Sequence, residues 1–473
     1  MVKILAVNTV CEAVEGGRCF MSEDQNIRVS RREFLRDSAW AAAAAAFAAA
    51  LQERLEAQQK RNQPARPTTP RPPASTQPRP ASQPARNLPP VHIGFIGTGT
   101  QGQTLLQRLV RIPGVRVLAV CDIYPPHLAR GLRMAGPQAK GYEDYRQVLD
   151  RKDIDAVIIA TPLSLHAPMS IDALQAGKHV FCEKTMAYSV EDARRMVQVS
   201  RETGKHLQIG HQRHYSPIYA HAREMMVEQE VIGRLVHVRA WWHRNNSWRR
   251  PVPDKRYEEL LNWRLYRKYS QGLMAELASH QIDVVNWFTG STPIAVMGMG
   301  GIDYWKDGRE VWDNVEVIYE YPNGVKVVYT SILSNQYDGY AEQFMGDKGT
   351  LLLTNEKDGF LFKEPTAEEL GWEAHAKKAT GKGGTTGLVL DVTATKKKGT
   401  GAVIGGQKMA AGYELKDAYT LELESFVNDV VRHGQKPLCD AEVGFKTAVT
   451  VLMANQAIEQ GTKITFTPEM FQV

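Results

Sequence analysis

Three glycines between positions 97 and 102 have the spacing of a loop that binds phosphate groups. Gly97, Gly99 and Gly102 form the pattern G-x-G-x-x-G. Since glycine lacks a Cβ atom, the first can form a tight turn, the second admits a phosphate and the third lets a helix pack closely. Free backbone N–H groups at the start of that helix would then bind the phosphates. The pattern therefore predicts a site for a phosphate-bearing ligand.

The residues around these glycines supply the elements that would position them. Val91–Ile96 is a short apolar run typical of a buried parallel strand, and residues 104–110 have helical apolar spacing. A second apolar run, Val115–Cys121, ends at Asp122, twenty residues after Gly102. An acid at this position accepts hydrogen bonds from an adenosine ribose and repels a 2′-phosphate. The unit thus predicts a dinucleotide site that favours NAD over NADP.

The alternation of strands and helices continues after this unit. Further strands are predicted at residues 156–160, 179–181 and 207–210, and helices at 142–149, 170–176 and 190–203. In a parallel sheet, ligands lie beyond the carboxyl ends of the strands. The candidate cofactor-binding residues are therefore the three glycines with Thr100, Gln101, Asp122, Thr161, Pro162, His166, Glu183 and Lys184.

From residue 91 onward the sequence resembles the Gfo/Idh/MocA family of oxidoreductases. The most specific part is residues 176–184, Ala-Gly-Lys-His-Val-Phe-Cys-Glu-Lys, which is similar to a family signature ending in Glu-Lys-Pro. The resemblance implies that Lys184 lies beside the nicotinamide and acts in proton transfer. This sequence has Thr185 in place of the proline, and we expect that change to loosen the turn while retaining the amine.

Residues 272–283 carry a second resemblance, to a family pattern in which an acid and a histidine lie four residues apart. Here the pair is Glu276 and His280, and a spacing of four on an α-helix places both side chains on one face. The family acid is usually aspartate, so the longer Glu276 places its carboxylate differently. The resemblance implies that His280 accepts the proton of a substrate hydroxyl or orients that hydroxyl for Lys184. Two ligands without a third predict no metal site.

The second half of the chain has the alternating pattern of a sheet with one solvated face. Strands are predicted near 236–241, 294–299, 315–321, 325–332, 342–345 and 351–353, with a hairpin turn at 321–324. The prediction is one large, mostly antiparallel sheet, as in the family's substrate domain. Two further helices, at 421–433 and 442–459, return to the Rossmann domain in the family.

Aromatic and planar polar side chains suit the binding of a sugar or polyol. The candidate substrate-binding residues are His211, Arg213, Tyr215, Trp263, Arg264 and His280, to which the 241–246 stretch, Trp-Trp-His-Arg-Asn-Asn, could add.

The first ninety residues differ in composition from the rest. Residues 30–36, Ser-Arg-Arg-Glu-Phe-Leu-Arg, resemble a twin-arginine export signal and precede an uncharged, alanine-dominated stretch at 39–51. The alternative is an alanine-rich helix preceded by basic residues. We expect a signal region at 1–56 with its true start at Met21, recognised by the twin-arginine export machinery. The mature protein would be exported, periplasmic and without a stable membrane span. Ten prolines between 61 and 90 predict an extended linker over 57–90.

Charge and cysteine content narrow the remaining classes. The formal net charge is +6, but the 57–90 linker carries six basic residues and no acid, so the globular part is nearly neutral. It offers no electrostatic case for binding nucleic acid. The three cysteines after residue 90, which are Cys121, Cys182 and Cys439, lack the spacing of a disulfide framework or a zinc site.

Together these features predict an α/β protein with a Rossmann domain at 91–215 and an α/β substrate domain at 216–473. We expect an NAD-dependent oxidoreductase acting on a secondary alcohol of a sugar, glycoside or polyol, and a homo-oligomer. Since an exported enzyme has no dependable pool of free NAD, the cofactor should be tightly held. One alternative is a redox-neutral glycosidase or lyase of the same superfamily, which the Glu183-Lys184 pair disfavours. Another is a cofactor-loaded binding protein without turnover, against which Lys184, Glu276 and His280 argue.

Overall fold

The computed structural model describes residues 89–369, 373, 376–380, 386–390, 403–404, 407–408 and 416–473. The chain divides into two units, Met1–Gln77 and Pro78–Val473, and every described residue belongs to the second. The predicted signal region, nearly all of the linker and the loops around residues 381–384 and 396–401 lie outside the described residues. In the part that is described, no helix combines the length and apolarity needed to cross a bilayer.

The first domain is a six-stranded parallel sheet, as the sequence predicts, with the strand order β3-β2-β1-β4-β5-β6. Its strands are β1 (Val91–Ile96), β2 (Val115–Cys121), β3 (Lys140–Tyr142), β4 (Ala156–Ile159), β5 (His179–Glu183) and β6 (Leu207–Gly210). The helices between them are α3 (Thr100–Leu109), α4 (Pro125–Ala135), α5 (Tyr145–Leu149), α6 (His166–Gln175) and α7 (Val190–Thr203). Every residue of β4 is buried, which explains its run of apolar and β-branched side chains.

The second domain is built on a ten-stranded, mostly antiparallel sheet, which confirms the predicted fold class. The strand order is β14-β15-β13-β12-β11-β7-β10-β9-β8-β18, and only β7 and β10 pair in parallel. The strands are β7 (Leu235–His243), β8 (Ala295–Gly301), β9 (Asn314–Glu320), β10 (Lys326–Ile332), β11 (Tyr340–Gly346), β12 (Gly349–Thr354), β13 (Asp358–Lys363), β14 (Lys378–Thr380), β15 (Thr386–Val389) and β18 (Ile464–Thr465). Sequence patterns did not predict the strands β13, β14, β15 and β18.

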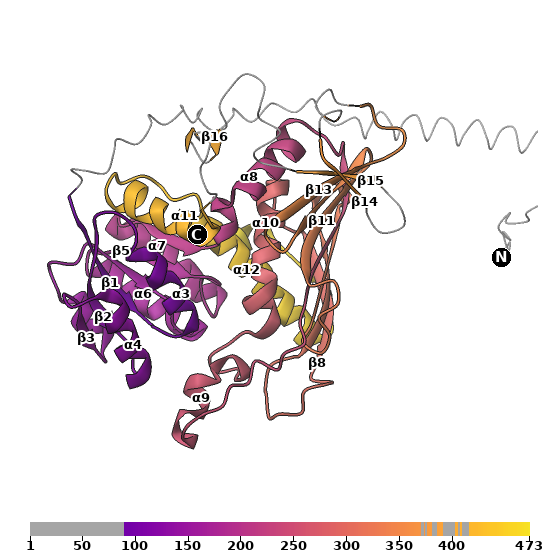
Figure 1. Cartoon of the computed structure of the whole chain (residues 1–473). Coiled ribbons are helices and arrows are strands. Elements are labelled where there is room, and N and C mark those ends of the chain that lie inside the picture. The colour runs from indigo at the N-terminus through magenta and orange to yellow at the C-terminus, as the bar shows by residue number, and fades with distance from the viewer. Residues whose placement is uncertain are drawn as a thin grey trace, which may run out of the picture. The chain divides into compact units, whose positions relative to one another are not determined.

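Two long helices cover the buried face of this sheet and connect it to the first domain. The helix α10 (Ser279–Thr289) follows a π-helical turn, η7 (Met274–Ala278), and packs against α12 (Ala441–Gln460). The helix α12 contacts β8 of the large sheet as well as α7 and β6 of the parallel sheet (Figure 1). Through these contacts α12 bridges the parallel sheet and the large sheet.

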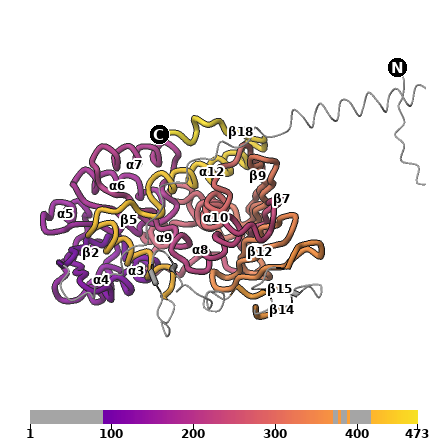
Figure 2. Tube along the Cα trace, turned by 90° about the horizontal axis from the view of Figure 1, so that it is seen from above, coloured from indigo at the N-terminus to yellow at the C-terminus, as the bar shows by residue number. Residues whose placement is uncertain are grey.

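Two predicted helices are divided differently in the structure. The 421–433 segment consists of α11 (Ala418–Ser425), which contacts α3, and a π-helical turn, η11 (Phe426–Val431) (Figure 2). The 142–149 segment begins as the edge strand β3, so the helix starts only at Tyr145, where the Asp144 side chain accepts a hydrogen bond from the Arg146 N–H. Propensity alone does not separate a short edge strand from the first turn of a helix.

Candidate active site

The glycine loop between β1 and α3 has the geometry that phosphate binding requires. Gly97 has a φ of +88°, and a Cβ atom on Gly102 would lie 2.0 Å from the Gly97 carbonyl oxygen. A Cβ atom on Gly99 would meet only the His127 ring, at 3.9 Å, so the space beside the helix start is open. The first turn of α3 contains no acid and its N-cap Gly99 makes no side-chain hydrogen bond. The helix N–H groups are therefore available to an anion, and the loop fits a dinucleotide.

Asp122 follows β2 and faces this loop. Its Oδ2 atom accepts hydrogen bonds from the Thr98 N–H (2.7 Å) and the Thr98 hydroxyl (3.2 Å), and its Oδ1 atom accepts one from the Tyr124 N–H (2.8 Å). The His127 Nδ1 atom lies 3.7 Å from Oδ2. These contacts fix the orientation of a carboxylate that could accept hydrogen bonds from the hydroxyl groups of a ribose.

His166 holds two loops together rather than facing the crevice with a ring nitrogen. The side chain is 2% exposed, with Nδ1 lying 2.8 Å from the Thr185 carbonyl oxygen and Nε2 3.0 Å from that of Thr161. Burial lowers the pKa of His166. Each ring nitrogen lies against a backbone carbonyl, and the single N–H of a neutral imidazole can donate to one of them. This placement speaks against the predicted direct contact between His166 and a cofactor. Thr161 and Pro162 remain at the carboxyl end of β4, as predicted.

Lys184 reaches across from the first domain to the second. The preceding residue, Glu183, accepts a hydrogen bond of 2.7 Å from the Gln101 amide of the glycine loop. The Lys184 Nζ atom donates a hydrogen bond of 2.8 Å to the backbone carbonyl of Glu276. The Thr185 hydroxyl donates one of 2.7 Å to the Ala275 carbonyl and is buried. The expectation that Thr185 loosens this turn is therefore wrong, because its hydroxyl anchors the turn to the second domain.

The surroundings of Lys184 favour its neutral form. Burial lowers the pKa of the Lys184 amine, and the positive charges of Arg264 and Arg244 lower it further. The carboxylates of Glu276 and Glu183 act in the opposite direction, but the net shift is downward. A lysine with a lowered pKa can act as a general base closer to neutral pH than a free one.

The sequence predicts Glu276 and His280 on one face of a regular α-helix, and the structure differs. Glu276 lies in the π-helical turn η7, whereas His280 lies in the first turn of α10. π-Helical turns are rare in proteins, and those that occur are often found at functional sites. The Glu276 carboxylate accepts hydrogen bonds from Arg264 Nε (2.9 Å) and the Ser270 hydroxyl (3.2 Å). Glu276 therefore orients Arg264 with its side chain and Lys184 with its backbone.

His280 provides a neutral imidazole beside these groups. The side chain is 8% exposed, and its Nδ1 atom has no hydrogen-bond partner among the described residues. Burial holds the pKa of His280 well below its usual range. The ring centre lies 5.3 Å from that of Trp242. A neutral imidazole can accept a proton or orient a hydroxyl group.

Arg213 does not face a ligand site. Its guanidinium is 1% exposed, forms an ion pair with Glu342 and lies 2.8 Å from Glu356. The Tyr219 hydroxyl completes the cluster with a hydrogen bond of 2.8 Å to Glu342. This placement speaks against the predicted substrate contact of Arg213, because its charge is already balanced inside the protein.

His211 is likewise buried, and it lies beside one cluster with metal-binding residue types. Among the described residues, His214, Asp283 and Cys439 bring their potential ligand atoms within 4.8 Å of one another. The His214 Nε2 atom lies 2.9 Å from Asp283 Oδ2, although neither atom makes a hydrogen bond among the described residues. The ring nitrogens of His211 have no hydrogen-bond partner among the described residues, and burial lowers its pKa to about 4. Tyr215 is also buried, at 8% exposure.

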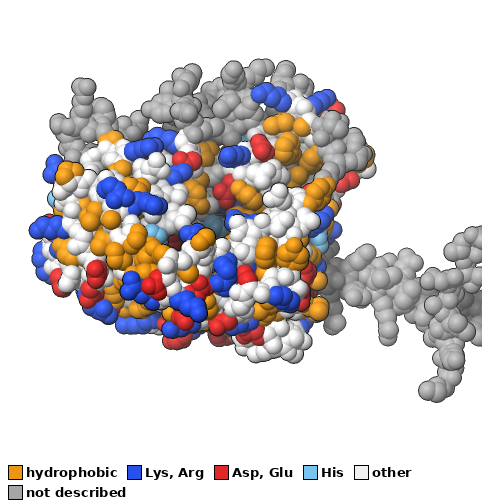
Figure 3. Space-filling view, turned by 60° about the horizontal axis from the view of Figure 1, so that its bottom comes forward, with side chains coloured by type: hydrophobic (Ala, Val, Ile, Leu, Met, Phe, Trp, Pro, Cys, Tyr) orange, Lys and Arg blue, Asp and Glu red, His pale blue; other side chains and the backbone are white. Residues whose placement is uncertain are grey.

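Arginines and aromatic rings line the second-domain side of the site. The Arg264 guanidinium lies 4.2 Å from the Trp263 ring centre, and that of Arg244 lies 4.9 Å from the Trp242 ring centre. Figure 3 shows a face of the molecule with a hollow, in which histidine and acidic side chains are visible among Lys and Arg side chains. Sequence reasoning did not single out Arg250, which donates a hydrogen bond of 2.7 Å to the hydroxyl of Thr100. A contact between residues 150 positions apart leaves no local signal.

The chain combines a parallel sheet that carries a dinucleotide-type glycine loop with a second domain, and Lys184 spans the boundary between them. The chain belongs to the Gfo/Idh/MocA oxidoreductase family. Residues 91–211 match the NAD-binding Rossmann-fold domain of that family, and residues 224–466 match its C-terminal alpha/beta domain.

Curated relatives include enzymes of two kinds. The chain is 33% identical over 198 residues to inositol 2-dehydrogenase of Salmonella typhimurium, a match that covers 41% of this chain and 53% of that protein. It is 35% identical over 158 residues to alpha-N-acetylgalactosaminidase of Bacteroides fragilis, covering 32% of this chain and 37% of that protein. The matches therefore span about half or less of these relatives.

Solved structures share the fold. Levoglucosan dehydrogenase in complex with NADH and levoglucosan has a TM-score of 0.64 at 19% identity, covering 79% of this chain and 99% of that chain. An NAD-binding protein from Listeria innocua has a TM-score of 0.60 at 20% identity, covering 81% and 98%. At this level of identity the likeness extends to the fold alone.

Proposed function

We propose that this protein oxidises or reduces a secondary alcohol of a sugar, glycoside or polyol with NAD. The observation that carries the proposal is the placement of Lys184 between the glycine loop, which binds the preceding Glu183, and the second-domain turn that precedes His280. Neither Lys184 nor His280 is needed merely to hold a dinucleotide. Their presence favours an enzyme over a binding protein without turnover.

In this mechanism the side chains of the protein move a proton, and a bound NAD would take up or supply the hydride. Neutral Lys184 accepts the proton of the substrate hydroxyl during oxidation and returns it during reduction. The imidazole of His280 orients the same hydroxyl, and Arg264, held by Glu276, offers its remaining N–H donors to neighbouring oxygens. The half-buried ring of Trp263 provides an apolar face for the carbon skeleton.

A redox-neutral glycosidase is the second candidate, because the chain also matches an alpha-N-acetylgalactosaminidase. Such an enzyme would oxidise a glycoside, eliminate the leaving group, add water in its place and then reduce the product with the same cofactor. A panel of sugars, polyols and glycosides separates the candidates when reduced nicotinamide and products are measured together. Net formation of NADH with an oxidised sugar supports a dehydrogenase, whereas cleavage without net NADH supports the glycosidase. Protein with bound NAD that changes no compound on the panel would contradict both.

We propose that the protein is exported through the twin-arginine route with its cofactor already bound. The support is the Arg31-Arg32 pair with the uncharged stretch behind it. Fractionation of cells expressing the full chain should find the protein in the periplasm, and Arg31→Lys with Arg32→Lys should retain it in the cytoplasm. The purified protein, once denatured, should release nicotinamide dinucleotide. Export of the double-lysine variant would contradict the twin-arginine route. Purified periplasmic protein without nicotinamide dinucleotide would contradict export with the cofactor bound.

We also propose a homo-oligomer that uses the solvated face of the large sheet. Met299 is 76% exposed, Met297 50% and Ile318 46%, and Met297 pairs directly with Ile318 across β8 and β9. Contiguous exposed apolar side chains of this kind commonly mark an interface. Light scattering should report a multiple of the chain mass for the wild type and a smaller species for Ile318→Lys. A monomeric wild type would contradict the proposal.

A further inference from the structure

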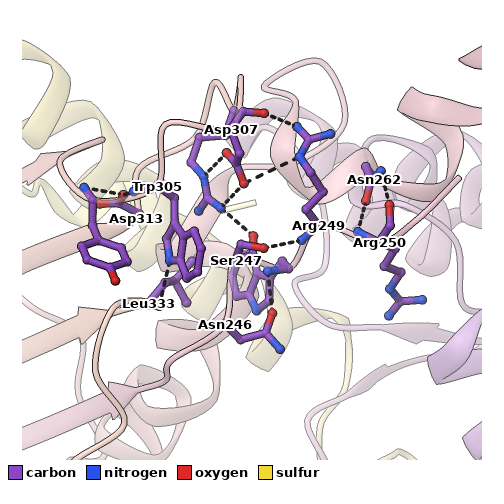
Figure 4. Close-up of polar contacts among 12 residues, drawn as sticks. Asn246, Ser247, Arg249, Arg250, Asn262, Trp305, Asp307, Asp313 and Leu333 are labelled. Atoms are coloured by element: carbon purple, nitrogen blue, oxygen red, sulfur yellow. Dashed lines mark hydrogen bonds and ion pairs between the residues drawn. The ribbon is translucent and has the colours of Figure 1, made fainter.

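Arg250 lies on a loop whose backbone is fixed by the second domain. The Arg250 N–H donates a hydrogen bond of 2.7 Å to the side-chain oxygen of Asn262, and the Asn262 amide donates one of 3.1 Å to the Arg250 carbonyl (Figure 4). Asn262 itself is only 2% exposed. One buried side chain thus holds both backbone polar groups of Arg250, which restricts where the guanidinium can reach.

A second set of contacts fixes the residues just before Arg250. Arg249 forms an ion pair with Glu258 and donates a hydrogen bond of 2.6 Å to the Asp307 carbonyl. Buried Arg309 binds the Asp307 carboxylate and donates a hydrogen bond of 2.6 Å to the Ser247 carbonyl. Charge-assisted contacts of this kind are stronger than neutral ones. The loop is therefore a rigid support rather than a free surface segment.

The Arg250 guanidinium, by contrast, makes a single hydrogen bond among the described residues. One N–H group donates to the hydroxyl of Thr100, the first residue of α3, at 2.7 Å. Among the described residues, no carboxylate forms an ion pair with Arg250. A guanidinium has five N–H donors in a planar fork, so four remain beside the helix start at which the glycine loop would place a diphosphate.

We infer that Arg250 binds the diphosphate of the dinucleotide from the second domain and thereby slows its release. The inference rests on the proposed function for the identity of the ligand. The helix N–H groups would bind the diphosphate from one side and the guanidinium fork from the other, with two parallel hydrogen bonds. Because Arg250 is carried by a fixed loop, little ordering accompanies binding. The cofactor can leave only after this contact breaks, so Arg250 supplies the slow dissociation that a retained cofactor requires.

The test measures dissociation of NADH by its fluorescence after addition of excess NAD, using the full chain. Arg250→Ala should release NADH at least about tenfold faster, since it removes hydrogen bonds to a charged group. Arg250→Lys should be intermediate, because it retains the charge and loses the fork. Arg256→Ala is the matched control, since the Arg256 side chain is 70% exposed and faces Asp254. ADP-ribose has the diphosphate without nicotinamide. Its affinity for the Arg250→Ala protein should fall by about the same factor as the release rate of NADH rises.

The outcomes separate this inference from the proposed function. A folded Arg250→Ala protein that releases NADH within twofold of the wild-type rate overturns the inference and leaves the proposed function intact. Equal acceleration by Arg250→Ala and Arg256→Ala also overturns it, because the effect would then be one of surface charge. A wild-type protein that binds neither NADH nor ADP-ribose contradicts the proposed function itself.

Discussion

The Nζ atom of Lys184 donates a 2.8 Å hydrogen bond to the backbone carbonyl of Glu276. This contact joins the carboxyl end of β5 in the parallel sheet to the π-helical turn η7 beneath the large sheet. The amine is thereby held between the dinucleotide loop and the second-domain side chains. Lys184 is held by the backbone of Glu276, so a substitution of the Glu276 side chain can remove the negative charge near Lys184 without removing the hydrogen bond that positions its amine.

Lys184→Ala should reduce turnover by about 100-fold or more while leaving NADH affinity nearly unchanged, since it removes acid–base assistance to the hydroxyl group. Steady-state kinetics and a fluorescence titration measure the two effects separately. Lys152→Ala, at an exposed position of the same domain, is the control. Turnover equal to the wild type would exclude Lys184 as the base.

Glu276→Gln should move the pH dependence of substrate oxidation to lower pH. Lys184 acts as a base in its neutral form, which is populated above its pKa, and the Glu276 carboxylate raises that pKa. Removing the negative charge therefore lowers the Lys184 pKa further, and the rising limb of kcat/KM shifts down. Arg244→Ala should move the limb in the opposite direction, because Arg244 lowers the Lys184 pKa. If the rising limb of kcat/KM stays at the same pH in both variants, a group other than Lys184 titrates there.

Asp122→Ser should narrow the preference for NAD over NADP, because a neutral residue no longer repels a 2′-phosphate. The Ser hydroxyl can retain part of the hydrogen bonding to Thr98 that positions this loop. Dissociation constants of both cofactors for both proteins measure the change. Tighter binding of NADP by the wild-type protein would contradict the predicted specificity.

Arg213→Met should destabilise the fold by about 3–5 kcal/mol, because it leaves the buried carboxylate of Glu342 without its cation. The free energy of unfolding, from denaturant titration, measures the loss. A companion variant, Arg213→Met with Glu342→Gln, should recover part of it. If Arg213→Met raises KM and leaves the free energy of unfolding unchanged, Arg213 contacts the substrate as the sequence predicts.

Local sequence determined most of the parallel sheet and its loop. The positions of Gly97 and Gly102 follow from sterics within a few residues, because a Cβ atom at either position would collide with nearby backbone. Asp122 and Lys184 could be placed because the carboxyl ends of parallel strands meet at one edge. The alternation of apolar residues likewise predicted the large sheet, since a strand with one solvated face repeats every two residues.

The tertiary structure alone decided which of these side chains are free to act. The sequence does not distinguish Arg213 from Arg264. Tertiary packing buries Arg213 against Glu342 of β11, whereas Arg264 pairs with Glu276 and stays partly exposed. The π-helical turn at Glu276 is set by contacts with its surroundings, because helical periodicity predicts a regular α-helix there. Arg250 meets Thr100 only because the two domains fold against each other. Local patterns encode backbone conformation, whereas the partners of a charged side chain depend on residues that are distant in the chain.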